Sequence, residues 1–115
     1  MAAVRVLFVC TGNLCRSPMA EAMLRHAVEE RGCRDVEASS AGTWAAEGYG
    51  ATTDAADVLG EKGIDLTAHV SRPLRSADLQ GSDLVVAMTS VHAREIAELD
   101  RDGLESYGLT ATLAS

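Results

Sequence analysis

The sequence predicts an α/β fold: a three-layer sandwich in which helices cover both faces of a four-stranded parallel sheet. Residues 4–9 and 84–88 are short, almost wholly apolar runs rich in β-branched side chains, which is typical of strands buried on both faces. Each run precedes a segment whose apolar residues recur at helical spacing, and strands that alternate with helices form parallel sheets with right-handed crossovers. The 115 residues are expected to form one domain with its own hydrophobic core.

The first helix is expected to follow the first strand after a short loop. Ser17 is a suitable N-cap, Pro18 fits the first helical position, and Gly32 is expected to end the helix. Its apolar side is expected to contain Met19, Ala20, Met23, Leu24, Ala27 and Val28.

The rest of the chain continues the alternation of strands and helices, without an internal repeat or a linker. The expected elements are a weaker strand at 36–41, a glycine-containing loop at 42–53, a helix at 54–62 closed by Gly63, a short helix near 76–79, the strand at 84–88, a helix from Thr89 or Ser90 to about Leu99, and a last strand at 109–113.

Composition and charge argue against several classes of function. The net charge is −7, so the overall electrostatic field repels nucleic acids and anionic membranes, and neither is expected as a partner. No apolar run is long enough for a membrane span, and the N-terminus lacks the features of a secretory signal. We therefore expect a cytoplasmic protein.

The cysteines are odd in number, and two of the three, Cys10 and Cys15, lie in one short loop. This pattern indicates reactive thiols in a reducing compartment rather than a disulfide framework, and Cys33 is expected only to pack. No zinc-type spacing joins the cysteines to the histidines at positions 26, 69 and 92, so no metal and no cofactor is expected.

The loop between the first strand and the first helix is the candidate functional site, because ligands of parallel sheets bind at the carboxyl ends of the strands. Its glycine and the helix N-terminus turn several backbone N–H groups toward one point, where a phosphate group can be held. Arg16 adds a bidentate guanidinium for phosphate oxygens. The same positive potential favours the thiolate of Cys10, which would attack the phosphoryl group and form a phospho-cysteine, while Ser17 would stabilise the departing thiolate.

A purely structural interpretation treats Cys10 as a small buried hydrophobic residue and Arg16 as a surface charge. It leaves the Gly-Asn pair inside the loop and the Ser-Pro pair at the helix start unexplained. A C-x5-R spacing with all of these after a buried strand is a specific pattern, so we favour the phosphate-binding interpretation.

The segment VCTGNLCRSPMAEA resembles the phosphate-binding loop of the low-molecular-weight protein tyrosine phosphatases. The resemblance continues through SSAGT, GIDLTAHVSRPL and SDLVVAMTSVH in the family's order and covers nearly the whole chain. It implies that Cys10 is the nucleophile, that Arg16 binds phosphate and that Ser17 stands beside the thiolate. It further implies that Asn13 holds the shape of the loop and that His69 supports the loop by hydrogen bonding.

The same resemblance suggests which residues surround the substrate. Cys15 matches a second loop cysteine that forms a reversible disulfide with the nucleophile, which would protect the thiolate from over-oxidation. Trp44 is a candidate wall for a phosphotyrosine ring, although it stands two positions earlier than the tryptophan of typical tyrosine-specific members. Arg72 and Arg75 either form a solvated basic face or steer phosphate. The remaining residues expected to contact substrate are Thr11, Gly12, Asn13 and Leu14.

Two parts of the family pattern have no counterpart in this sequence. The family's general acid is the aspartate of an Asp-Pro pair, and neither of the two prolines here follows an aspartate. The acid is therefore unknown, with Asp100 and Asp102 as candidate replacements, and slow turnover of poor leaving groups is expected. The family's final helix is missing too, so an apolar sheet face is expected to be exposed, with a homodimer through that face as one consequence.

The preferred interpretation is a phosphatase acting on phosphotyrosine in proteins or on small aryl phosphates, because Leu14 offers an apolar wall to an aromatic ring. A protein-arginine phosphatase is an alternative, since AMTSVH and the early Trp44 are similar to that branch. An arsenate reductase-like enzyme is disfavoured because no cysteine follows Cys33, and a sugar phosphotransferase carrier because that class lacks the loop arginine. A pseudophosphatase that only binds phosphate stays open because the acid is missing.

Overall fold

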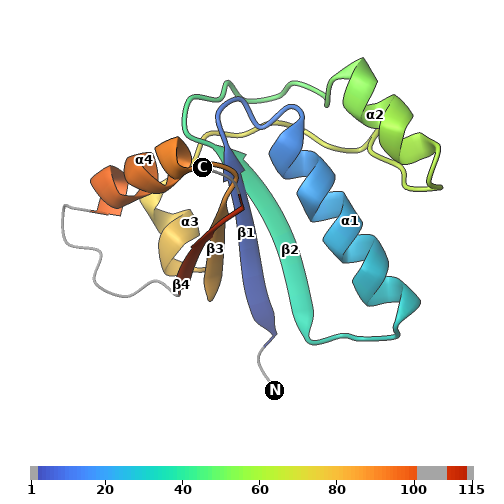
Figure 1. The fold of residues 1–115 in the computed structure, drawn as a ribbon, viewed down its shortest axis with the longest axis horizontal. Coiled ribbons are helices and arrows are strands. Elements are labelled where there is room, and N and C mark those ends of the chain that lie inside the picture. Colours follow the sequence, from blue (N-terminus) through green and yellow to red (C-terminus); the bar gives the residue numbers. More distant parts are fainter. Residues whose placement is uncertain (1–2, 101–108, 114–115) are drawn as a thin grey trace.

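The computed structural model describes residues 3–100 and 109–113. The elements in chain order are β1 (Val4–Cys10), α1 (Arg16–Glu30), β2 (Val36–Gly42), α2 (Thr53–Gly60), α3 (Ser76–Gln80), β3 (Leu84–Ala87), α4 (Ser90–Asp100) and β4 (Leu109–Thr112). All strand pairs are parallel, and the strand order is β2-β1-β3-β4 (Figure 1). The predicted four-stranded parallel sheet is confirmed, and every predicted boundary lies within about two residues of the observed one.

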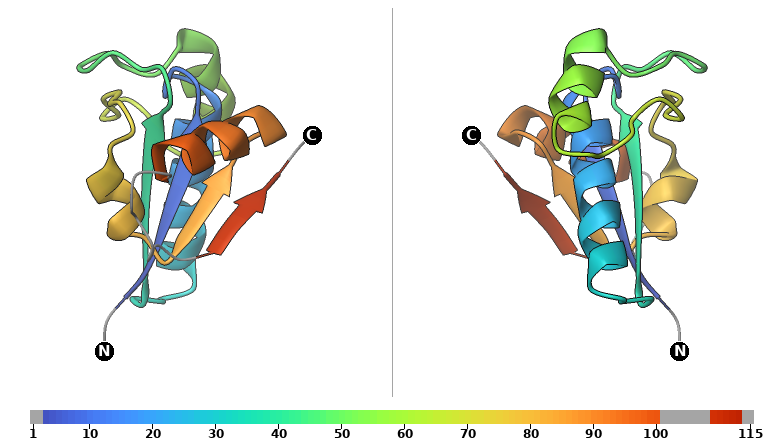
Figure 2. Two further views of the ribbon diagram at one scale, coloured as in Figure 1. Left: turned by 90° about the vertical axis from the view of Figure 1, so that its left-hand side faces the viewer. Right: turned by 90° about the vertical axis from the view of Figure 1, so that its right-hand side faces the viewer.

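Helices cover both faces of the sheet, and Figure 2 shows α1 and α3 on opposite sides of it. On one face, Leu7 and Val9 of β1 pack in a buried cluster with Leu79 of α3 and Ile96 of α4. On the other face, Phe8 packs in a cluster that includes apolar residues of α1. Because both faces are covered, β1 is apolar at nearly every position instead of alternating. Among the described residues, no helix is long and apolar enough to cross a bilayer.

The start of α1 differs from the sequence-based expectation. Cys15 is the N-cap residue, so Ser17 and Pro18 are the second and third helical residues, and both are buried. Pro18 is still tolerated there because the first N–H groups of a helix have no intrahelical partner. The expectation that Ser17 caps the helix is wrong, since its hydroxyl is held by side chains inside the protein. Gly32 has a φ of 65° just after the helix, as expected of a helix end.

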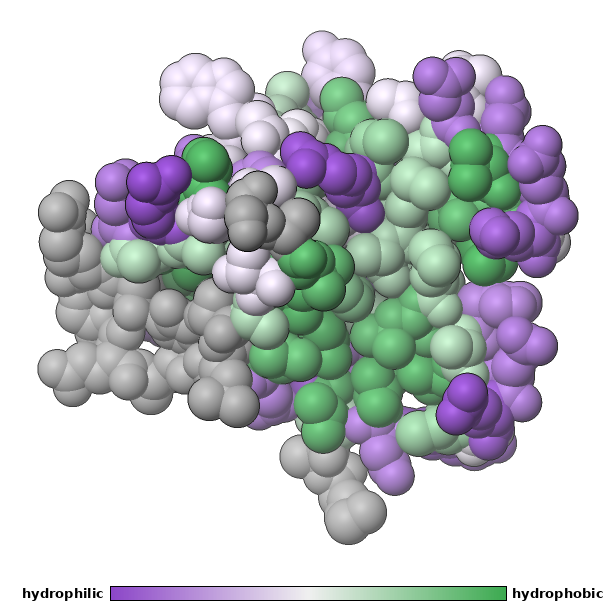
Figure 3. Space-filling model, viewed as in Figure 1, coloured by the Kyte–Doolittle hydropathy of each residue, from purple (hydrophilic) through white to green (hydrophobic). Residues whose placement is uncertain are grey.

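The apolar side of α1 is narrower than expected. Ala20 and Leu24 pack toward the sheet, but Met23 is 47% exposed and Ala27 is also exposed. These two residues lie on a flank of the helix that neither the sheet nor α2 covers. On the same side of the sheet, Leu113 beyond β4 is 65% exposed. Figure 3 shows hydrophobic side chains gathered over this side of the molecule; pairing with a second copy through it stays a prediction.

The segment before α3 runs beside the active-site end of β2. The Gly42 N–H donates to the Arg72 carbonyl across 3.0 Å, and the Leu74 N–H donates to the Gly42 carbonyl across 2.7 Å. Gly42 and Pro73 thereby form an isolated parallel bridge at the outer side of β2. This bridge places residues 71–74 next to the loop that follows β1.

Candidate active site

The loop of residues 11–15 connects the carboxyl end of β1 to α1, at the edge of the sheet where the other strands also end (Figure 1). Its first part is tied to the chain that leaves the neighbouring strand β2. The Thr43 N–H donates to the Cys10 carbonyl across 2.8 Å, and the Trp44 N–H donates to the Thr11 carbonyl across 2.9 Å. The loop therefore has a fixed position relative to two strands.

The loop presents its backbone N–H groups as free donors. In the described part of the chain, none of the N–H groups of residues 11–15 donates to a backbone carbonyl. Asn13 has a φ of 56°, a left-handed conformation that asparagine adopts more readily than other side-chain-bearing residues and that turns successive N–H groups the same way. Together with the N-terminus of α1, these donors form a cradle for an anion.

Asn13 is the central support of the loop, and its side chain is fully buried. Its amide oxygen accepts a hydrogen bond from the Arg72 backbone N–H across 2.9 Å, which fixes the orientation of the amide group because a backbone nitrogen can only donate. The amide nitrogen then donates to the hydroxyls of Ser17 and Ser40, each across 2.9 Å. One side chain thus connects the loop with α1, β2 and the segment before α3.

Ser17 transmits this orientation to Cys10. The Ser17 hydroxyl oxygen lies 2.9 Å from the Cys10 sulfur, and both residues are buried. Because the oxygen already accepts from Asn13, its own proton is free to point at the sulfur. A thiolate can only accept hydrogen bonds, so this arrangement favours the ionised form of Cys10.

Two further residues act on the loop from different sides. His69 Nε2 lies 2.7 Å from the backbone carbonyl oxygen of Asn13, within hydrogen-bonding distance, so this histidine contacts the loop where the resemblance places it. Arg16 is exposed, and it makes no salt bridge to any other residue within the described ranges. Its guanidinium is therefore available to an anion at the start of α1.

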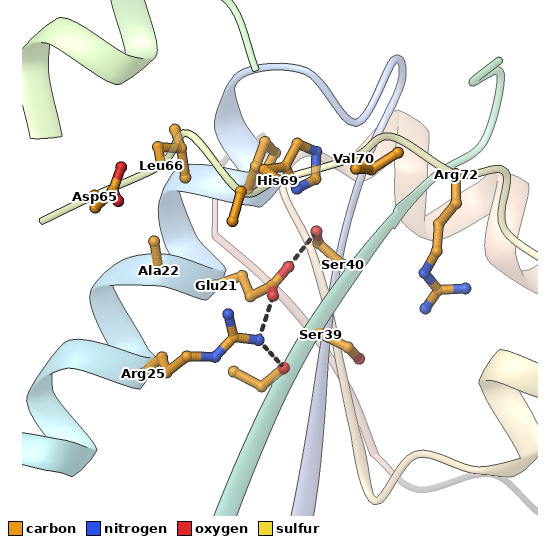
Figure 4. A pocket seen from close by; sticks show the side chains of 13 residues that line it. Glu21, Ala22, Arg25, Ser39, Ser40, Asp65, Leu66, His69, Val70 and Arg72 are labelled. Atoms are coloured by element: carbon orange, nitrogen blue, oxygen red, sulfur yellow. Dashed lines mark hydrogen bonds and ion pairs between the residues drawn. The ribbon is translucent and has the colours of Figure 1, made fainter. Parts of the chain in front are cut away.

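Behind the loop lies a cavity of about 260 Å³ that Ser40 and His69 help to line, whereas Cys10 and Arg16 do not (Figure 4). The Ser40 hydroxyl donates to one oxygen of Glu21 across 2.6 Å, and Arg25 pairs with the other oxygen of that carboxylate. These contacts continue the chain of hydrogen bonds from Cys10 to the surface of α1. The cavity belongs to the support of the loop rather than to the anion cradle.

The residues predicted to line the substrate are spread around the loop. Trp44 is 85% exposed, so its ring is not part of the core. Cys15 is exposed and has a free thiol, and Thr11 is exposed as well. Leu14 is half-buried, and its carbonyl accepts from the Thr52 N–H across 2.8 Å.

Other candidate residues are engaged elsewhere or lie outside the described part of the chain. Arg72 pairs with Asp78 across 2.7 Å and Arg75 pairs with Glu47, so these arginines are not a free basic face. The side chain of Asp100 and the whole of residue 102 lie outside the described residues. Within the described ranges, no group of three metal-ligating side chains is placed to hold a metal ion.

His92 is a site residue that the sequence analysis does not single out. It is 2% exposed, and its Nε2 lies 2.8 Å from the Thr11 hydroxyl. Burial lowers the pKa of His92, the positive charge of Arg16 lowers it further, and Glu95 acts in the opposite direction. One signal points to it in advance: it follows β3, and β3 lies beside β1 in the sheet.

These features define a class of protein in which a cysteine–arginine loop follows the first strand of a parallel α/β sheet and opens a helix. The chain belongs to the low molecular weight phosphotyrosine protein phosphatase family, whose model matches residues 5–107.

Individual relatives are similar over most of this chain. The protein-arginine-phosphatase of Bacillus subtilis (strain 168) is 47% identical over 92 residues, which cover 80% of this chain and 60% of that protein. This chain therefore spans less than two thirds of the length of that curated relative. The crystal structure of a low molecular weight protein tyrosine phosphatase from T. tengcongensis superposes with a TM-score of 0.85 at 42% identity, covering 95% of this chain and 73% of the other.

A third relative informs the chemistry of the loop. It is an arginine phosphatase solved as a cysteine-to-serine mutant with a phosphorylated active-site serine. It superposes with a TM-score of 0.79 at 44% identity, covering 83% of this chain and 61% of the other.

Proposed function

We propose that this protein is a phosphoprotein phosphatase that acts through a phospho-cysteine on Cys10. The observation that carries the proposal is the contact of 2.9 Å between the Cys10 sulfur and a Ser17 hydroxyl whose proton is directed at it. Free backbone donors and the unpaired Arg16 lie in the same loop, where they would hold the phosphate oxygens.

The reaction has two displacements at phosphorus. The Cys10 thiolate attacks the phosphorus, the bond to the ester oxygen breaks, and the leaving oxygen takes up a proton. Water then attacks the phospho-cysteine, the sulfur–phosphorus bond breaks, and Ser17 stabilises the departing thiolate by donating its proton in a hydrogen bond. The phosphorylated active-site serine of the mutant relative supports the assignment of the attacking atom to this position.

Proton donation to the leaving oxygen is the weak step in this chain. Its sequence holds no Asp-Pro pair, and no described residue has been assigned as the acid. We therefore expect this chain, taken alone, to form the phospho-enzyme fast with good leaving groups and slowly with poor ones.

Phosphotyrosine is the proposed substrate group, because the half-buried Leu14 and the exposed ring of Trp44 offer apolar surface beside the loop. Phosphoarginine is the second candidate, and the relatives that are protein-arginine-phosphatases favour it. Peptides that carry one or the other group separate the two, by comparison of kcat/KM. Leu14→Thr is expected to lower kcat/KM for the phosphotyrosine peptide and not for the phosphoarginine peptide.

Mixing the protein with p-nitrophenyl phosphate tests the proposed mechanism. A burst of nitrophenol equal to the enzyme concentration is expected, and Cys10→Ser is expected to abolish turnover while phosphate binding persists. Phosphate binding without any burst would show a pseudophosphatase instead. Cys15, exposed in the same loop, is the proposed partner for a reversible disulfide with Cys10, so peroxide followed by a thiol reductant should restore wild-type activity but not that of Cys15→Ser.

A further inference from the structure

His92 joins the first turn of α4 to the residue that follows the nucleophile. Its Nε2 lies 2.8 Å from the Oγ1 of Thr11, although the two residues are 81 positions apart in the sequence. The contact is shielded from solvent on the histidine side, since His92 is 2% exposed. A buried polar contact of this kind has one defined geometry, because either group left alone would lack a partner.

The direction of this hydrogen bond follows from the other ring nitrogen. The backbone N–H of Thr89 donates to Nδ1 of His92 across 3.1 Å, so Nδ1 has no proton. In the neutral ring the proton is therefore on Nε2, and His92 donates to the Thr11 hydroxyl.

The surroundings keep this ring neutral. A proton on Nδ1 would face the Thr89 N–H, so two donors would meet without an acceptor. Arg16, at the start of α1, opposes a positive charge on the ring, whereas Glu95, one turn further along α4, favours one. Glu95 itself accepts from the Thr43 hydroxyl across 3.2 Å, so α4 contacts the residues that follow both β1 and β2.

We propose that His92 is a positioning residue of the phosphate-binding loop: its neutral ring fixes Thr11, and through Thr11 the backbone N–H groups that receive phosphate. Thr11 is then held at two points, by His92 at its side chain and by the Trp44 N–H at its carbonyl. Protonation of His92 breaks the contact with Thr89 and loosens the first residue of the cradle. This inference rests on the proposed function, because it assumes that the loop binds phosphate.

Inorganic phosphate is the probe for the test, with its affinity measured by calorimetry at pH 7.5 and pH 5.5. His92→Phe removes both ring contacts, and a 3- to 10-fold loss of affinity at pH 7.5 is expected from the loss of about one net hydrogen bond. His92→Gln keeps a donor near the position of Nε2 and cannot titrate. It should bind close to wild type at pH 7.5, and the affinity ratio of wild type to His92→Gln should fall at pH 5.5. His26→Gln, at an exposed ion pair on α1, is the matched control and should follow wild type at both values.

A merely structural role for His92 gives a different pattern. If His92→Phe folds poorly, Thr11→Val removes the same contact from the other side and should give a similar loss, while the double variant should show no further loss. Nitrogen NMR of the ring should show the proton on Nε2. A proton on Nδ1, or equal affinity of all folded variants, would overturn the inference.

If wild type binds no phosphate, the proposed function has failed. The inference is then decided by the backbone amide resonances of residues 11–15, which should shift in His92→Phe and stay in place in His26→Gln. Unshifted loop resonances in His92→Phe would overturn it independently.

Discussion

The amide of Asn13 donates to the hydroxyl of Ser17 across 2.9 Å, and the direction of this hydrogen bond decides what Ser17 offers to Cys10. The direction is fixed remotely, by the Arg72 N–H that occupies the amide oxygen. Ser17 can therefore serve as a donor to sulfur without losing its own partner.

Ser17→Ala is expected to slow the alkylation of Cys10 by iodoacetamide at pH 7 about 3- to 10-fold, because the thiolate loses one hydrogen bond. The rate is measured in a Cys15→Ala, Cys33→Ala background, so that only one thiol reacts. The stability loss should be about 1–3 kcal/mol, from the buried Asn13 donor left without a partner, and not from a lost helix cap. Ser39→Ala, at the neighbouring position on β2, is the control; an unchanged alkylation rate in Ser17→Ala would contradict the assigned role.

Gly42→Ala is expected to disturb the loop as well as the sheet. A Cβ at Gly42 would lie 2.4 Å from the Thr11 carbonyl oxygen and 3.0 Å from the Asn13 backbone nitrogen, so the backbone has to move. A loss of at least about 1–3 kcal/mol in the free energy of unfolding is expected, together with weaker phosphate binding. Gly50→Ala is the matched control, because a Cβ there meets nothing within 4 Å, and urea unfolding of the two variants provides the comparison.

The stability of the protein should depend on pH through His92. Its pKa in the folded state lies below the ordinary value of 6.5, so the unfolded chain binds more protons at this residue as the pH falls past 6.5. Its contribution to stability is therefore complete above pH 6.5 and is lost as the pH falls below that value. Urea midpoints at pH 7.5 and pH 5 should show a smaller acid loss in His92→Gln than in wild type. An equal loss in both proteins would contradict this prediction.

The rate should depend steeply on the leaving group. A positioned general acid contributes roughly 10²–10⁴-fold, and that contribution is greatest for basic leaving oxygens. A series of aryl phosphates whose phenols differ in acidity should therefore show a steep fall in kcat/KM as the phenol becomes less acidic. A flat profile would mean that another group of this chain donates the proton.

Much of the fold follows from local patterns in the sequence. The apolar runs of β1 and β3 predict buried parallel strands because both faces of each strand are covered. The start of α1 is less predictable, since Ser17 suits an N-cap by type alone. Its burial and its hydrogen bond to Asn13 depend on the packing of the loop, which overrides the local preference.

The candidate site follows from the sequence only where it is contiguous. Cys10 and Arg16 lie on one loop, and the resemblance adds Asn13 and His69. The contact between His92 and Thr11 depends on which strands are neighbours, and nothing local in the sequence specifies that order. The side-chain placement of Met23 likewise depends on what covers the far flank of α1.

The bridge between Gly42 and Pro73 also bears on association through strand edges. β2 is an edge strand, and an uncovered edge can recruit a strand from another molecule. At its active-site end, both the N–H and the carbonyl of Gly42 are already occupied by the 71–74 segment, and Pro73 has no N–H to offer outward. The chain that orients Asn13 thus also guards this end of the sheet against aggregation.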